Sequence, residues 1–157
     1  MNTKRTLTTL AAFLPVALAT ASLAAAAAAP RSAAVLIRHQ TRGCHSWAVN
    51  GGPFNPSQTL KLAVNGSLTI TNNDLMPQKL VETSGPSVRM QAVPTPMGMG
   101  LRAHFGAGMM AHMGAITKVT FPTAGVYVFT TKPGEDYMPG IKTIGEDNVL
   151  KLVVRAG

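Results

Sequence analysis

Methionine, histidine and glycine are concentrated between Pro86 and Gly114. Six of the eight methionines beyond the first residue lie there with two of the four histidines, a higher density than packing requires. Thioether sulfur is a soft ligand, and together with imidazole it favours Cu(I) over hard cations. We therefore expect a copper-capturing segment, unless the methionines fill gaps in a core or form a surface for another protein. The expected ligands are Met109, Met110, His112 and Met113.

Cys44 is the one cysteine, so it cannot form an internal disulfide. It is an intermolecular partner, a small buried residue or a metal ligand, and with His45 beside it the pair is a second candidate copper site. Neighbours on a flat strand point to opposite faces, so both bind one metal only if the chain bends, for example at Gly43. In the alternative, His45 shares a face with Trp47 as a hydrogen-bonded core histidine. His39 lies in a polar stretch and is expected to be solvated.

The elements that would position these residues are short β-strands separated by proline and glycine. Asn65-Gly66 is a residue pair typical of tight hairpin turns. Period-two alternation indicates half-buried antiparallel strands, and hence an all-β Greek-key sandwich or barrel of seven or eight strands. The segment 86–114 is expected to be a long loop, with one or two helical turns as an alternative within it. The expected strands are Ala34–Ile37, Ser46–Val49, Thr59–Val64, Ser67–Thr71, Leu80–Thr83, Ile116–Phe121, Gly125–Thr131 and Asn148–Arg155.

The order of these segments resembles the cupredoxin fold, the β-sandwich of small blue copper proteins. The resemblance covers nearly all of the chain after its leader. It rests on Phe54-x-Pro56, Leu60 to Gly66, Leu68 to Asp74, Met76 to Val81, the Phe121-to-Gly125 turn with Tyr127 and Phe129, and the closing strand.

The resemblance also implies where a blue copper centre would lie. Its first histidine would fall on Gln78, its cysteine on Thr131 and its second histidine close to Gly134, whereas the axial methionine has a counterpart in Met138. Because that chemistry needs a thiolate with two imidazoles, we expect the usual type 1 centre to be absent. The family's arrangement would bring Met76, Met138 and the 86–114 loop to the same end of the sandwich.

The N-terminus has the pattern of a secretory signal peptide: Lys4 and Arg5, a short apolar run and then small residues up to Ala29. We expect residues 1–29 to be a cleaved leader and residues 30–157 to form a single domain. The chain would then be secreted or periplasmic, with no stable membrane anchor after cleavage.

The chain is basic, with 14 Lys and Arg against 6 Asp and Glu. Its cations are spread singly and are not clustered with aromatic residues, so we expect no nucleic-acid partner and only a weak attraction to anionic surfaces. The sequence has no nucleophile elbow, phosphate loop or zinc-protease motif, so we do not expect an enzyme.

Together these features predict an exported protein that binds or traffics copper, with Cu(I) favoured as the cofactor. The expected partners are the metal ion and another exported copper-handling protein. Two alternatives are a metal-free interaction or structural module and electron transfer through an altered copper centre.

Overall fold

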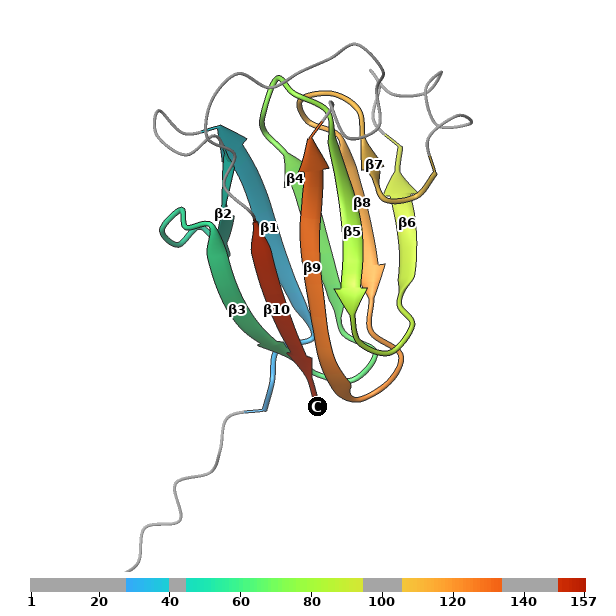
Figure 1. The fold of residues 1–157 in the computed structure, drawn as a ribbon. Helices are drawn as coiled ribbons and strands as arrows, with labels where there is room; N and C mark the ends of the chain where they lie inside the picture. The colour runs from blue at the N-terminus through green and yellow to red at the C-terminus, as the bar shows by residue number, and fades with distance from the viewer. Residues whose placement is uncertain (1–27, 40–44, 95–105, 134–149) are drawn as a thin grey trace, which may run out of the picture.

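Alternating segments form ten strands in the computed structural model, which describes residues 28–39, 45–94, 106–133 and 150–157 (Figure 1). The strands are β1 Ser32–His39, β2 His45–Val49, β3 Ser57–Leu62, β4 Ser67–Asn72, β5 Gln78–Ser84, β6 Arg89–Val93, β7 Met109–Met110, β8 Ile116–Thr120, β9 Gly125–Pro133 and β10 Lys151–Ala156.

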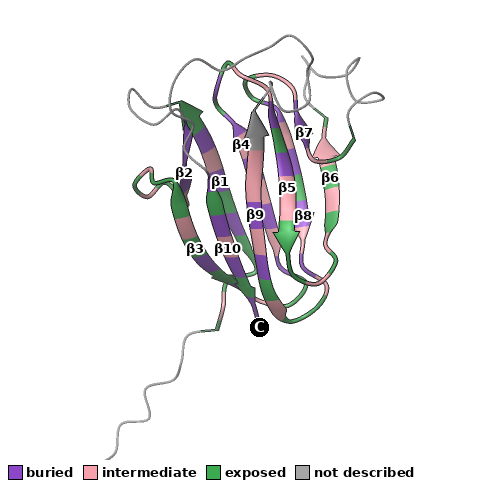
Figure 2. Cartoon of the chain, viewed as in Figure 1, coloured by how far each residue is buried: buried purple, intermediate pink, exposed green. Residues whose placement is uncertain are grey.

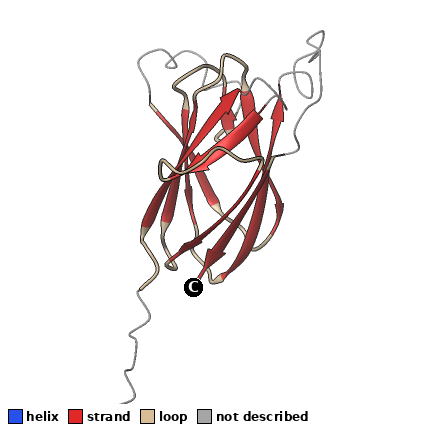
Figure 3. Cartoon of the chain, turned by 90° about the vertical axis from the view of Figure 1, so that its left-hand side faces the viewer, coloured by secondary structure: helices blue, strands red, loops and turns tan. Residues whose placement is uncertain are grey.

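The strands form two five-stranded layers. Sheet A has the order β2-β1-β4-β8-β6, and sheet B has the order β3-β10-β9-β5-β7. The side view shows the two layers of strands, with no helix among the described residues (Figure 3). The prediction of an all-β sandwich is confirmed. The sheets are mixed, because β1 pairs with β4 in parallel and β10 pairs with β3 in parallel. The expectation that all the strands would pair in antiparallel fashion was therefore wrong.

The core lies between the two sheets. Buried and more exposed residues alternate along most of the strands (Figure 2), as period two requires. Trp47, Phe121, Tyr127 and Phe129 are among the largest fully buried side chains. The Phe121 ring meets Tyr127 edge-on at a centroid distance of 4.9 Å, a favourable arrangement of two aromatic quadrupoles. The Tyr127 hydroxyl donates to the carbonyl of Thr123 at 2.6 Å, so this buried polar group is satisfied.

The Asn65-Gly66 turn differs from the expected hairpin. Asn65 has φ 61°, but Gly66 does not have a positive φ, as the expected Asn-Gly turn would require. The Gly66 amide donates to the Ala63 carbonyl at 2.8 Å, so Val64 and Asn65 are the central residues of the turn. However, β3 belongs to sheet B and β4 to sheet A, so the turn carries the chain from one layer to the other. The Asn65 amide donates to the Phe121 carbonyl at 2.8 Å, which ties this crossover to the end of β8. The residue pair indicated a turn at this point, but neither its central residues nor the strands that it joins are those of the expected hairpin.

Two strands lie inside the segment that was expected to be a loop. β6 pairs with β8 at the edge of sheet A, and β7 pairs Met110 with Gln78 and Met109 with Lys79 at the edge of sheet B. Met109–Met110 is therefore a strand, and the alternative of a helical turn starting there was wrong. A strand of two residues is too short to show a period-two pattern in the sequence. Its extended conformation follows from its pairing with β5. Residues 95–105 of this segment lie outside the described residues.

All three interruptions of the described chain occur at one end of the sandwich, which we call the upper end after its place in Figure 1. They fall between β1 and β2, between β6 and β7, and between β9 and β10. Cys44 and Met138 belong to two of these segments and lie outside the described residues. Within the described residues there is no helix with the length and apolar character needed to cross a membrane.

Glu82 in β5 provides a test of the packing between the sheets. It shares a face with buried Leu80, and its Oε1 is shielded from solvent without a hydrogen-bond partner in the part of the chain that the structure describes. Desolvation raises the pKa of Glu82. Because the folded pKa is the higher one, this group contributes stability below its unfolded pKa and loses it as the pH rises through the folded pKa.

We therefore expect Glu82→Gln to raise the melting temperature at about pH 7 and to have no such effect at about pH 3, where the carboxyl is protonated in both states. Thermal denaturation followed by circular dichroism across this range measures the difference. A gain that is the same at every pH would contradict the assigned cause.

Candidate metal centre

Two histidines end the β1–β2 pair at the upper end of the sandwich. His39 is the last residue of β1 and His45 the first of β2, and the two are direct partners in register. Two pairs further into the sheet, buried Ile37 lies opposite buried Trp47. Because residues two apart on a strand share a face, both histidines continue the core-facing side of sheet A. Their ring centroids are 5.8 Å apart in an edge-on arrangement.

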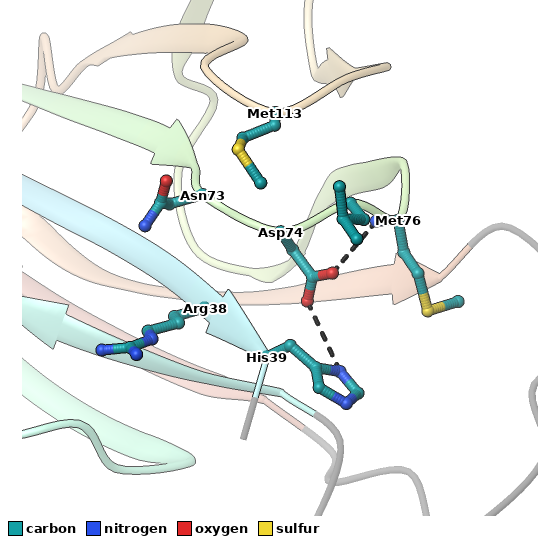
Figure 4. Close-up of a pocket in the computed structure, with 7 residues that line it drawn as sticks. Arg38, His39, Asn73, Asp74, Met76 and Met113 are labelled. Atoms are coloured by element: carbon teal, nitrogen blue, oxygen red, sulfur yellow. Dashed lines mark hydrogen bonds and ion pairs between the residues drawn. The ribbon is translucent and has the colours of Figure 1, made fainter. Parts of the chain in front are cut away.

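Asp74 brings a carboxylate to these two imidazoles from the turn after β4. Its Oδ2 lies 3.3 Å from His45 Nε2 and 3.8 Å from His39 Nδ1. Its Oδ1 accepts a hydrogen bond from the Met76 amide at 3.0 Å. The side chain is only 3% exposed, so the carboxylate is turned into the protein. Figure 4 shows it between His39 and the Met76 backbone.

The turn that carries Asp74 is held by Asn72, which is fully buried at the end of β4. Its Oδ1 accepts from the Asp74 amide at 3.0 Å. Its Nδ2 lies 2.9 Å from the Met76 carbonyl, 3.1 Å from that of Met110 and 3.4 Å from that of His112. One side chain therefore links the turn to the segment that follows β7. This gives Asp74 a fixed position, whereas an exposed aspartate would be mobile.

The three side chains are close enough to share one metal ion. Their ligand atoms all lie within 4.8 Å of one another. Two ligands about 2.1 Å from a metal at the tetrahedral angle are about 3.4 Å apart, so closure requires the farthest ligand atoms to approach each other by roughly 1.4 Å. The His39 ring can make this movement because it is 56% exposed, while the His45 and Asp74 side chains are 4% and 3% exposed.

A pocket of about 310 Å³ opens beside this cluster (Figure 4). Met76 and Met113 bring two thioethers to its wall, on either side of Asp74 in the view. Leu75 at its edge is 83% exposed. Imidazole, carboxylate and thioether donors thus border one small space. The lining residues are Arg38, His39, Asn73, Asp74, Leu75, Met76 and Met113.

The structure places the predicted ligands in different surroundings. His45 belongs to the cluster, and it is also a buried residue on the Trp47 face, as the alternative interpretation expected. Met109 and Met110 are buried in β7, and Met110 is part of the hydrophobic core. His112 lies outside the cluster, with its Nδ1 2.8 Å from the Met113 carbonyl.

Sequence reasoning missed His39 and Asp74. His39 is exposed, as expected, but its ring also faces a carboxylate. The signal that could have found it is the pairing of β1 with β2, which places His39 opposite His45. Asp74 had no such signal, because its inward orientation depends on Asn72 and on the turn geometry.

The positions at which the resemblance would place a type 1 copper centre hold other side chains, as the sequence indicates. Gln78 is completely buried, lies opposite Met110 and has no hydrogen-bond partner at either amide atom among the described residues. Thr131 in β9 lies opposite Leu80. Neither side chain supplies a thiolate or an imidazole. Gly134 and Met138 lie outside the described residues.

A scan against protein-family models found no match, and a search of the curated proteins found none either. Among solved structures, an inclusion body protein (PixA) from Burkholderia cenocepacia is 11% identical with a TM-score of 0.44, over 83% of this chain and 98% of that one. A multicopper oxidase is 12% identical with a TM-score of 0.41, over 83% of this chain and 45% of that one.

A second multicopper oxidase, from Pediococcus acidilactici, is 9% identical with a TM-score of 0.41, over 90% of this chain and 28% of that one. This chain therefore spans less than half the length of either oxidase. At these identities and TM-scores, the likenesses bear on neither a metal nor an activity.

The unpartnered amide of Gln78 predicts a stabilising substitution. A buried polar group without a hydrogen bond costs about 1–3 kcal/mol, so Gln78→Leu should raise the free energy of unfolding by about that amount. The matched control is Gln58→Leu, because Gln58 Nε2 donates to the carbonyls of Trp47 and Pro53 at 3.0 and 2.9 Å. This control should be destabilised.

Chemical denaturation of the purified, metal-free chain measures both variants. A loss of stability in Gln78→Leu would show that the amide has a partner, contrary to the geometry of this site.

Proposed function

We propose that this protein is an exported copper-binding protein that holds the ion at the upper end of the sandwich. His39, His45 and Asp74 form the ligand set, with the thioethers of Met76 and Met113 beside it. One observation carries the proposal: the three ligand atoms lie within 4.8 Å of one another. The signal-peptide pattern supports export, and the resemblance to cupredoxins supports copper.

The donor types favour copper over other common ions. Calcium and magnesium prefer shells made of oxygen ligands, and this cluster offers a single carboxylate. Two imidazoles and a carboxylate suit Cu(II) and Zn²⁺, and Cu(II) is the tighter binder of the two in most such sites. Thioethers add a preference for Cu(I), the state favoured from the sequence. Met76 and Met113 would serve that state, with His39 as the accessible imidazole beside them.

The role that fits this site is holding and transferring copper. The positions expected for a blue copper centre carry Gln78 and Thr131, and Cys44, the only thiol, lies outside the described residues. The open pocket at the cluster gives a donor or acceptor access to the ion. A second exported copper-handling protein remains the expected partner.

A second candidate is a metal-free structural role, and one observation favours it. Asp74 already accepts from the Met76 amide and pairs with both histidines, so the cluster holds the β1–β2 end against the turn after β4. A buried, paired carboxylate of this kind can exist purely for structure. The two roles differ in what they predict for His39, the exposed member.

The first test replaces His39 by alanine in the purified chain. If the cluster binds copper, His39→Ala should lower the affinity for Cu(II) by more than about tenfold, since even residues that only orient a ligand contribute that much. Competition with a chromophoric chelator measures the affinity. The control is His112→Ala, which removes a histidine outside the cluster and should leave Cu(II) affinity unchanged.

The results of this test separate the candidates. Failure of the unmodified chain to retain copper against the chelator would overturn the proposal and leave the structural role. A loss confined to His112→Ala would instead place the site in the methionine-rich segment.

The second test asks whether the thioethers serve Cu(I). Met76→Leu combined with Met113→Leu keeps the shape of the pocket wall and removes both sulfurs. We expect Cu(I) affinity to fall by more than about tenfold while Cu(II) affinity changes little, because sulfur is the soft donor. The control is Met90→Leu, a half-buried methionine that packs against the core. An equal loss for both oxidation states would contradict a specific role in Cu(I) binding.

A further inference from the structure

The exposed charges of the described residues are all positive. The two carboxylate side chains among them are those of Asp74, which is buried, and Glu82, whose Oε1 is shielded between the sheets. By contrast, lysine and arginine stand exposed on the outer faces of both sheets. Sheet A carries Arg38, Arg89 and Lys118, and sheet B carries Lys61, Lys79, Lys151 and Arg155.

Sheet B places two of these cations directly side by side. Lys61 of β3 and Arg155 of β10 are partners in parallel register, and both are exposed. Neighbouring strands are about 4.8 Å apart, and like charges directly opposite each other destabilise a sheet. Neither residue forms an ion pair with a carboxylate in the part of the chain that the structure describes. An anion placed over this pair would relieve the repulsion.

The same face carries aliphatic side chains between its cations. Val153 lies opposite Val128 in register, and Val126 lies opposite Arg155 and is 47% exposed. Tyr127 and Phe129 of β9 point into the core, so the aromatic residues of this strand are turned away from the outer face. Single-stranded nucleic acids are bound through exposed aromatic platforms, which β9 does not offer. Valines flanked by cations instead suit a binding partner that has an anionic outer layer and an apolar layer behind it.

We propose that the outer face of sheet B docks on an anionic lipid surface. Lipid phosphates would lie over Lys61 and Arg155, with Lys151 and Lys79 adding charge toward the upper end, while the valines contact the headgroup boundary. Each cation near an anionic membrane contributes about fivefold in affinity, so four of them give reversible binding. The proposal is independent of copper, because none of these residues lines the pocket.

Vesicle sedimentation of the purified chain tests this docking. Binding is expected to vesicles that contain phosphatidylglycerol and to be absent with phosphatidylcholine alone. Lys61→Gln with Arg155→Gln should lower the partition coefficient roughly thirtyfold, since two contributions are lost. Because this double variant removes the repulsion between the two side chains, its melting temperature should not fall.

The matched control is Arg89→Gln with Lys118→Gln on the outer face of sheet A, which changes the net charge by the same amount. It should bind the anionic vesicles nearly as well as the unmodified chain. Equal losses in the two double variants would mean that only net charge matters and would overturn the assignment to sheet B. Binding to heparin without binding to anionic vesicles would overturn the lipid proposal in favour of a soluble polyanion.

Discussion

The buried amide of Asn72 is the interaction on which the upper end of this sandwich depends. It lies within hydrogen-bond distance of carbonyls from Met76, Met110 and His112, and its oxygen accepts from the Asp74 amide. Backbone groups buried at strand ends need partners, and here one side chain supplies them for two separate segments. The result is a turn that points a carboxylate inward. The cluster with His39 and His45 follows from that orientation, because an outward Asp74 would leave two imidazoles and no anion between them.

The sequence predicted the sandwich because alternation is a local property. Leu60 and Leu62, or Leu152 and Val154, show their buried face without any knowledge of the partner strand. The pairing of strands was less accessible, as Asn65-Gly66 illustrates. That turn is centred on Val64 and Asn65, one residue earlier than expected, and it joins strands of different sheets.

The candidate site was predicted in part for the same reason. The residue types predicted His45, Met76 and Met113 as ligands. His45 belongs to the cluster, and the two methionines line its pocket. Met110 has the same chemistry but is enclosed in the core, and only its pairing with Gln78 decides that. To predict His39, one would have needed the register of β1 against β2. To predict Asp74, one would have needed the turn that Asn72 holds through contacts far along the chain. Such features depend on three-dimensional packing, which the type and spacing of residues in one sequence do not encode.

The inward carboxylates connect the two proposed activities physically. Asp74 is buried beside the histidines and Glu82 is partly buried, so the exposed charged side chains on the outer faces of the described strands are those of lysine and arginine. The two surfaces point in different directions: sheet side chains stand perpendicular to the strands, whereas the pocket lies at the strand ends. Docking through sheet B would therefore leave the pocket open. An anionic surface also concentrates cations in the adjacent water. A copper site beside such a surface would meet more metal than the same site in bulk solution.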